Sequence, residues 1–406
     1  MDRRSFLRGV WGAAVGTPSA FSVARLRAEE SGEKFEESVR ESARAAADWL
    51  LRETAYGWNP ALNRALAGDN LLRRAGVFAA LARAARVFRW RDRLAGEATL
   101  AERVAREAGE FCAAHTTSNG AGVVRPNAAY EAANPVGMAA LLVLAYAELD
   151  ERSRDAGAAH RELCLGLERF LMERQRPDGS FRLGPSHNVL DDEGGDDPDA
   201  AAYYPGEALY ALARWHGVER ASWREEALAR AFPPYRAHWR RFRQQAFIPW
   251  QSCAYAEAFL QTKRREYAEF VFEMNDWLAP LQYASDGRTP AEWAGGFDAV
   301  WEGERLHHPP GASTGSYAES LVDALRVASE VGDGARAERY EKGVVAALEF
   351  LMSLQYLASN TRHFQPELQR RLHGAIRASV EDGAVRVDFA QHALSAMCGY
   401  LEHCGA

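Results

Sequence analysis

Lysine, cysteine and long apolar runs are scarce in this chain of 406 residues. Only three of its 49 basic residues are lysine, which we attribute to compositional bias, and its net charge is −7. Nucleic-acid binding needs clustered cations that neutralise phosphates, so no nucleic-acid partner is expected. No run of about 18 apolar residues follows the N-terminal segment. Stable membrane insertion is therefore not expected either.

The five cysteines do not form a Cys-x-x-Cys pair. Thiolate zinc sites rely on such pairs, so no metal centre is predicted from them. Most of the cysteines fall within helical apolar patterns, where cysteine acts as a small hydrophobic side chain. A disulfide between Cys398 and Cys404 would suit an oxidising compartment, but the sequence leaves this pairing open.

The N-terminal segment has the pattern of an export signal. Residues 2–8 read Asp-Arg-Arg-Ser-Phe-Leu-Arg, which resembles the twin-arginine translocation motif. A weakly apolar stretch follows and ends at Ser22-Val23-Ala24, whose small residues suit a signal peptidase. We expect residues 1–24 to be a twin-arginine signal peptide that binds the twin-arginine translocase. The mature protein is then periplasmic or extracellular. The alternative is a chance arginine pair before an amphipathic helix.

The rest of the chain shows helical periodicity almost throughout. Segments with a charged face alternate with segments that are rich in alanine and carry less charge. A helix that is apolar on most faces must be buried, so this alternation predicts an inner ring wrapped by an outer ring. The charged-face segments are 36–53, 97–115, 160–175, 222–242, 265–282 and 335–356. The alanine-rich segments are 70–89, 135–149, 205–216, 250–263, 316–331 and 387–402.

Three of the outer segments end alike, with apolar residues followed by Gln175, Gln282 or Gln355. Gln175 continues as Arg-Pro-Asp-Gly-Ser-Phe, which is a tight-turn signal. This motif resembles the repeat motif of squalene-cyclase and prenyltransferase toroids, and related turns occur in six-hairpin glycosidases and lyases. The resemblance implies an all-α fold, an (α/α)6 toroid of six helical hairpins, with residues 30–406 as one domain. It identifies no specific family.

Polar and aromatic residues gather at the starts of the predicted inner helices. In an α/α ring these starts meet at one mouth of the central cavity, where the helix dipoles favour anionic groups. Sugars stack on aromatic rings and exchange hydrogen bonds with carboxylates and amides, so a carbohydrate fits such a mouth. The candidate substrate-binding residues are Arg74, Asn134, Tyr203, Tyr204, Trp250, Gln251, Tyr317 and His308.

Four residues are candidates for catalysis: Glu207, Glu319, Asp388 and His392. Asp388 and His392 share one helix face, and an aspartate can orient an imidazole as a general base. A buried polar pair between two helices is the alternative. Glu207, Glu257 and Glu319 stand at matching places in inner segments. They can supply the paired carboxylates of glycoside hydrolysis, or each can satisfy a helix start.

Two loops contain residues that bear on a metal site or on the cavity. The acidic run between Asp191 and Asp199 has enough oxygen ligands for Ca²⁺, but it lacks EF-hand spacing. We favour a solvated loop, and no cofactor or metal is predicted. Residues 284–315 form a long loop whose aromatic residues predict an ordered lid over the cavity. The Gly-x-Ser-x-Gly pattern at 311–315 follows no strand, so we interpret it as a glycine-rich helix entry.

These features predict an exported carbohydrate-active enzyme: a glycoside hydrolase, a polysaccharide lyase or a uronate epimerase. Its substrate would be a saccharide or polysaccharide bound at the inner-helix N-terminal mouth. A non-catalytic toroid that binds a glycan or peptide, or that scaffolds partners, is the alternative. A third hypothesis, an isoprenoid-handling protein, requires a mainly apolar cavity. The chain lacks the DxDD and DDxxD patterns of terpene cyclases, which counts against that chemistry.

Overall fold

The computed structural model describes residues 20–53, 55–66, 71–88, 99–127, 134–150, 157–183, 198–301 and 303–403. Most of the predicted signal peptide and most of the acidic run from Asp191 to Asp199 lie outside these ranges. So does Cys404, while Cys398 is a buried free thiol. The chain divides into an N-terminal unit that ends at Ser38 and a compact unit that begins at Val39. The compact unit alone is described below.

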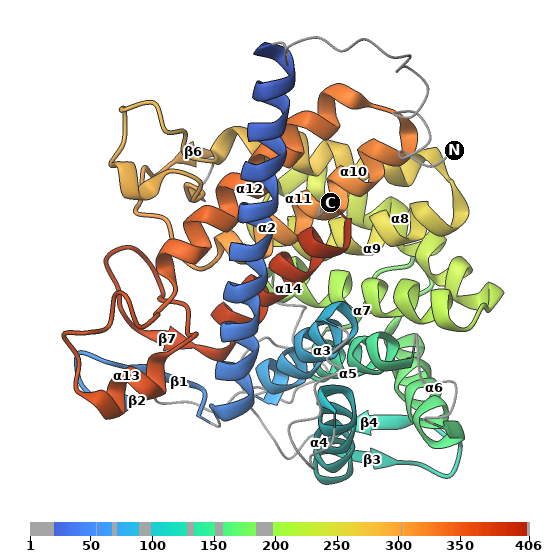
Figure 1. The fold of residues 1–406 in the computed structure, drawn as a ribbon. Coiled ribbons are helices and arrows are strands. Elements are labelled where there is room, and N and C mark those ends of the chain that lie inside the picture. The colour runs from blue at the N-terminus through green and yellow to red at the C-terminus, as the bar shows by residue number, and fades with distance from the viewer. Residues whose placement is uncertain are drawn as a thin grey trace, which may run out of the picture. The chain divides into compact units, whose positions relative to one another are not determined.

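Among the described residues, six helices form a closed inner ring (Figure 1). Each contacts the next in chain order, and the last of them returns to the first. Their inner faces are almost wholly buried, and in the fourth helix every residue from Ile248 to Phe259 is buried. The ring consists of α3 (Leu71–Phe88), α5 (Pro135–Asp150), α7 (Pro198–Val218), α9 (Ile248–Thr262), α11 (Thr314–Val331) and α14 (Val387–His403).

An outer helix precedes each inner helix in the chain. Most outer helices contact the inner helix that precedes them in the chain more extensively than the one that follows. The outer helices are α2 (Ala20–Arg52), α4 (Leu100–His115), α6 (Gly157–Arg174), α8 (Ser222–Phe242), α10 (Arg265–Leu278) and α12 (Gly334–Leu354). The prediction of an all-α (α/α)6 toroid is confirmed. Within the described residues no helix is long and apolar enough to cross a membrane.

Short elements fill the connections between outer and inner helices. β1 (Gly57–Asn59) pairs antiparallel with β2 (Arg64–Ala65) and with β7 (Val385–Arg386). Two further hairpins join β3 (Thr116–Ser118) to β4 (Val124–Pro126) and β5 (Val300–Trp301) to β6 (Glu304–Arg305). The remaining elements are α13 (Pro366–Leu372) and the 3-10 turns Gln245–Phe247, Ala279–Leu281 and Ala291–Trp293. The β1–β7 pairing ties the entry of the first inner helix to that of the last.

The three aligned glutamines join neighbouring outer helices. Gln175 Nε2 donates to the Ala227 carbonyl of α8, and Gln282 Nε2 donates to the Gly343 carbonyl of α12, each at 2.9 Å. Gln355 Nε2 donates to the Ser42 carbonyl of α2 at 3.0 Å. In each of these turns, a glycine with positive φ follows the glutamine. It packs against a backbone carbonyl of the neighbouring outer helix, three residues after the carbonyl that the glutamine binds. These glycines are Gly179, Gly295 and Gly374, facing Arg230, Ala346 and Ala45.

The glycines in these turns are required by geometry. A Cβ on Gly374 would lie 1.9 Å from the Ala45 carbonyl oxygen, and the other two positions are equally tight. With φ between 86° and 95°, these positions also disfavour residues with side chains. The motif is complete in sequence only after α6, but the structure repeats it after α10 and α12.

Buried ion pairs close the end of the ring where the inner helices finish. We call this cluster the floor. Its residues come from all six inner helices and are Arg83, Arg86, Glu148, Arg214, Glu257, Asp323, Arg326 and Glu402. Burial would raise the pKa of Glu148, but Arg214, Arg86 and Arg83 outweigh it and lower that pKa to about 2. Buried charges persist only when they are paired, and here the pairs follow the order of the helices.

We expect Gln355→Ala to lower the free energy of unfolding by about 3 kcal/mol, because buried groups lose their partner. Gln355 accepts from the Ser42 hydroxyl at 2.6 Å and donates to the carbonyls of Ser42 and Gly374. The matched control is Gln369→Ala, whose amide donates to the nearby Phe364 carbonyl, with an expected loss of about 1 kcal/mol. Urea unfolding measures both. Equal losses would contradict the closing role of Gln355.

Candidate active site

His392 and Glu319 form an ion pair between the last two inner helices. His392 Nδ1 lies 2.7 Å from Glu319 Oε1, with 24% of the imidazole side chain and 9% of the glutamate side chain exposed. Gly315, one turn before Glu319, makes this approach possible. A Cβ at Gly315 would lie 3.0 Å from the Ala393 nitrogen and 3.1 Å from His392. The carboxylate beside the imidazole is therefore Glu319, and not Asp388 as the four-residue spacing suggested.

The pKa values of both members of this pair are raised. Burial alone would lower the pKa of His392, but Glu319, Asp388 and Glu207 outweigh it and raise that pKa above its usual value. Burial raises the pKa of Glu319, and the charges of His392 and Arg83 offset this only in part. The imidazole thus keeps its proton to higher pH than an ordinary histidine does. It is also the member of the pair that solvent reaches more easily.

Glu207 is a neutral acid next to this pair. It lies on α7, is 5% exposed, and its Oε2 has no hydrogen-bond partner within the described residues. Gly137 of α5 leaves room for it, because a Cβ there would lie 2.5 Å from Glu207 Oε2. Burial raises the pKa of Glu207 to about 8, against the opposing charges of His392 and Arg73. An acid that stays protonated at neutral pH can donate a proton.

Aromatic rings border the acid and the imidazole. The Trp250 ring of α9 lies 5.8 Å from the His392 ring and 6.3 Å from the Tyr210 ring. Gly206 lets α7 and α9 meet here, since a Cβ on it would lie 2.5 Å from Trp250 Cβ. Trp250, Glu207, Glu319 and His392 therefore come from four inner helices to one place.

A second aromatic group surrounds Tyr317. Its ring lies 5.3 Å from that of Phe297, and burial together with the nearby Tyr203 raises its pKa. Tyr203 is 43% exposed, and its ring lies 6.5 Å from that of Tyr204. The candidate tyrosines thus stand at the entrances of α7 and α11, with the outermost ring open to solvent.

Asp388 faces two arginines. Arg73 Nε lies 2.8 Å from its Oδ2, Arg386 Nε lies 3.0 Å from its Oδ1, and a second Arg386 nitrogen contacts Oδ2. Both guanidinium groups lie over the Tyr56 ring, at 5.1 and 5.2 Å. Burial would raise the pKa of Asp388, but the hydrogen bonds and charges of Arg386 and Arg73 outweigh it and lower that pKa.

Other candidates lie apart from His392. Arg74 donates to the Glu53 carbonyl at 3.3 Å, so Arg73 is the arginine that reaches Asp388. Asn134 caps α5: its Oδ1 accepts from the nitrogens of residues 136 and 137, and its Nδ2 donates to residue 183. Gln251 is fully buried on the helix face of Tyr255, which packs in an aromatic cluster.

Glu257 also lies apart, although its local sequence matches that of Glu207. It belongs to the floor, where Arg214 and Arg326 approach it at 3.5 and 3.6 Å. The structure adds residues that helical periodicity could not find, because Tyr56, Phe297 and Arg386 stand in the connections between helices. The position of Arg386, two residues before Asp388, was the one available signal.

The described residues of the loop before α11 pack around the side chain of Asp298, and its role as a lid stays a prediction. The buried Asp298 accepts from Arg305 Nε at 2.8 Å and from the His308 backbone nitrogen at 3.1 Å. The His308 ring stays outside and contacts the Pro309 carbonyl at 2.8 Å through Nδ1. The helix begins at Thr314, so the Gly-x-Ser-x-Gly pattern is a helix entry and forms no nucleophile elbow.

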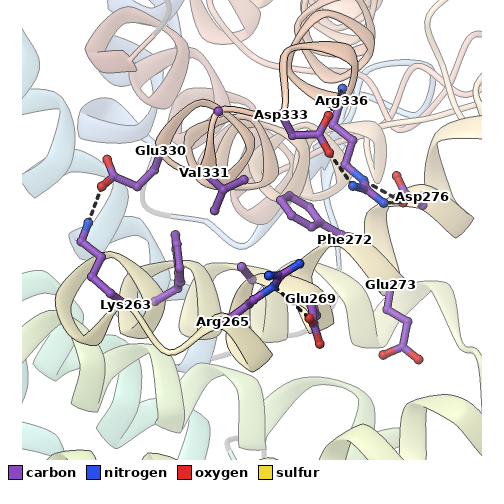
Figure 2. A pocket seen from close by; sticks show the side chains of 13 residues that line it. Lys263, Arg265, Glu269, Phe272, Glu273, Asp276, Glu330, Val331, Asp333 and Arg336 are labelled. Atoms are coloured by element: carbon purple, nitrogen blue, oxygen red, sulfur yellow. Dashed lines mark hydrogen bonds and ion pairs between the residues drawn. The ribbon is translucent and has the colours of Figure 1, made fainter.

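A groove of about 930 Å³ lies elsewhere, between α10 and the turn from α11 to α12 (Figure 2). Its charged side chains satisfy one another: Lys263 pairs with Glu330 at 2.6 Å, and Arg265 pairs with Glu269 at 3.3 Å. Arg336 binds Asp276 and Asp333 in the same way, as the dashed lines in Figure 2 show. The groove is therefore a junction between hairpins whose charged side chains pair with one another. It lies at the end of the ring opposite to His392. Within the described residues no group of histidine, cysteine and acidic side chains is arranged to hold a metal.

We expect the stability of the protein to fall with rising pH because of Glu207. Its pKa is 4.5 when unfolded and about 8 when folded, so between these values only the folded state keeps the proton. Stability then decreases by about 1.4 kcal/mol per pH unit. Glu207→Gln mimics the neutral acid and removes this slope, so its stability relative to the wild type should increase from about pH 5 to pH 8.

Urea unfolding at several pH values measures this difference. Glu257→Gln is the matched control, because the arginines around Glu257 lower its pKa in spite of burial. That carboxylate is ionised in both states above about pH 5, so the control difference should stay constant. A constant difference for Glu207→Gln as well would mean that Glu207 ionises freely in the folded protein.

The fold is known from other proteins. No family model and no curated protein matches this chain. Among solved structures, an unsaturated glucuronyl hydrolase specific for heparin aligns with a TM-score of 0.61 and 14% identity, over 90% of this chain and 98% of its own. Cellobiose 2-epimerase from Bacillus thermoamylovorans aligns with a TM-score of 0.63 and 11% identity, over 91% and 99%. A GH76 α-mannanase of Bacteroides thetaiotaomicron aligns with 0.56 and 7%, over 90% and 94%. The chain therefore shares the (α/α)6 fold of these proteins.

Proposed function

We propose that this chain is a glycan-active enzyme that works by acid–base catalysis at the mouth of the inner ring. The observation that carries the proposal is the meeting of Glu207, the His392–Glu319 pair and the Trp250 ring, each from a different inner helix. A neutral acid, an ionised carboxylate and an aromatic face are what cleavage of a sugar linkage requires. The structural neighbours named above act on glycans, which supports the same class.

Within that class the charges favour glycoside hydrolysis. Glu207 holds the proton that the leaving oxygen needs when the glycosidic bond breaks. Glu319, which lies 2.7 Å from His392 Nδ1, accepts the proton of the water that attacks the anomeric carbon. Glycoside hydrolysis divides its work between one carboxyl group that donates a proton and a second one that accepts a proton. The net reaction adds one water across one bond.

Proton abstraction by His392 is the second candidate, and the 2.7 Å contact with Glu319 favours it. A carboxylate that orients an imidazole is suited to removing a proton from a sugar carbon, as lyases and epimerases do. This role needs the neutral imidazole, whose pKa is raised. Activity would then increase with pH, whereas hydrolysis by protonated Glu207 would decrease above about pH 8. The pH profile therefore separates the two reactions.

The alternatives without sugar chemistry have less support. An isoprenoid-handling protein needs an apolar cavity, but Glu207, Glu319, Asp388 and His392 are all placed at the mouth. The buried Glu207 Oε2 has no hydrogen-bond partner within the described residues, which lowers the stability of the fold. A toroid that only binds or scaffolds would gain nothing from this loss. Functional sites are where such costs are commonly found.

Turnover assays on neutral and acidic oligosaccharides test the proposal. We expect Glu207→Gln and His392→Gln to lower kcat by about 100-fold or more, with the fold retained. Glu257→Gln is the matched control, since it is another buried inner-helix glutamate but belongs to the floor. It should change stability and leave kcat within about threefold. A folded wild type that turns over no glycan would instead favour the binding toroid.

We also propose that the protein is exported by the twin-arginine route, on the basis of the residues around Arg3 and Arg4. Replacing both with lysine should keep the protein in the cytoplasm, because the translocase reads the arginine pair itself. Cell fractionation with a C-terminal tag measures this. Equal export of the double variant would rule out that route.

A further inference from the structure

The cluster around Asp388 carries one uncompensated positive charge. Arg386 contacts both oxygens of the Asp388 carboxylate, whereas Arg73 contacts it only through Nε. The two terminal nitrogens of Arg73 have no hydrogen-bond partner within the described residues. The side chains of Arg73 and Arg386 are 30% and 28% exposed, so a ligand in solvent can reach them.

The guanidinium of Arg73 is held in place. The Tyr56 ring lies beneath Arg73 and Arg386, and the Phe389 ring lies 4.5 Å from the Arg386 guanidinium. Tyr56 is fixed in turn, because its carbonyl accepts from the Val387 nitrogen at 3.1 Å and the next residue, Gly57, pairs with Arg386. An arginine fixed by stacking loses little freedom when it binds an anion.

The position of Arg73 is unfavourable in the absence of an anion. It is the third residue of α3, whose first turn contains no acidic residue. The dipole at a helix N-terminus favours negative groups and disfavours cations. The two arginines in this turn differ in what they contact: Arg74 donates to the Glu53 carbonyl, while Arg73 contacts Asp388 through Nε and leaves its two terminal nitrogens without a hydrogen-bond partner within the described residues. Asp388 shares its single negative charge between Arg73 and Arg386, so the two arginines can take a second negative group.

The same cluster lies close to the proposed catalytic groups, because Asp388 stands one helical turn before His392 on α14. In keeping with this, Arg73 opposes the raised pKa of Glu207, and Asp388 contributes to the raised pKa of His392. A negative group on Arg73 would therefore belong to a molecule that also reaches the acid and the imidazole. This makes it a substituent of the substrate.

We propose that the substrate carries a carboxylate on the sugar that occupies the mouth, as a uronic acid does, and that Arg73 binds this carboxylate. The planar fork of arginine matches a carboxylate through two parallel hydrogen bonds. This inference rests on the proposed function for its sugar and on the arginine geometry for its charge. The experiment below distinguishes a failure of the carboxylate inference from a failure of the proposed function.

The experiment compares methyl glucuronoside with methyl glucoside, which differ only at C6, as ligands of the full chain in NMR titrations. We expect the glucuronoside to bind at least about tenfold more tightly, the usual effect of one charge-assisted hydrogen-bond pair. Arg73→Gln should abolish this difference, and Arg73→Lys should retain part of it because it keeps the charge but loses the fork. Arg106→Gln is the control, since Arg106 is exposed on outer helix α4 and pairs with Glu110. It should leave the difference within about twofold.

Turnover of the matching acidic and neutral oligosaccharides is measured in parallel. A preference for the uronoside that survives in Arg73→Gln, or no preference at all, overturns the carboxylate inference, and turnover then still upholds the proposed function. If the uronoside preference depends on Arg73 but no oligosaccharide is turned over, the anion site is supported and the proposed enzymatic function is rejected. Should Arg73→Gln fail to fold, Arg73→Lys decides, because an unchanged preference in it would overturn the bidentate contact.

Discussion

The seam between the first and the last inner helix is the constraint on which the rest of this structure depends. Three contacts run along it: Arg73 with Asp388 at the mouth, Gly76 against Gln391 in the middle, and Arg83 with Glu402 at the floor. Their partners are more than 300 residues apart in the chain. Gln355 makes the corresponding junction in the outer ring, where it reaches Ser42. Contacts at such separation form late, because the entropy of closing the intervening chain must first be overcome.

The site exists only when several hairpins of the ring are assembled. His392 stands on α14 but its carboxylate partner is on α11, and the acid Glu207 comes from α7. Glycines set these distances: Gly315 admits His392, Gly206 admits Trp250 and Gly137 admits Glu207. None of these residues is positioned by its own hairpin. The proposed acid–base chemistry would therefore depend on several hairpins of the ring, and not on any one of them.

The sequence predicted the helices well and the site only in part. Amphipathic periodicity reports which face of a helix is buried, so the twelve segments and their alternation were readable. It does not report the level of a residue along the ring axis. Glu207 and Glu257 share a local pattern, but Gly206 packs against Trp250, which places Glu257 two turns lower beside Arg214. The same limit paired His392 with Asp388, since a shared face says nothing of Glu319 on another helix. Tyr56, Phe297 and Arg386 lie in connections between helices, where the sequence shows no hydrophobic periodicity from which they could be predicted.

Charged side chains are paired differently at the two ends of the ring axis, and this difference supports placing the proposed chemistry at the mouth. In the floor, arginines and carboxylates alternate around the ring, and the arginines keep Glu148 and Glu257 ionised. A seven-residue step, two helical turns, separates this layer from the mouth: Arg214 follows Glu207, Glu257 follows Trp250, and Arg326 follows Glu319. At the mouth the compensation is incomplete within the part of the chain that the structure describes, because there Glu207 has no cation in contact and Arg73 has no second anion. Paired charges stabilise the ring and are chemically inert, whereas the unpaired acid and the unfilled guanidinium retain the capacity to transfer a proton and to bind an anion.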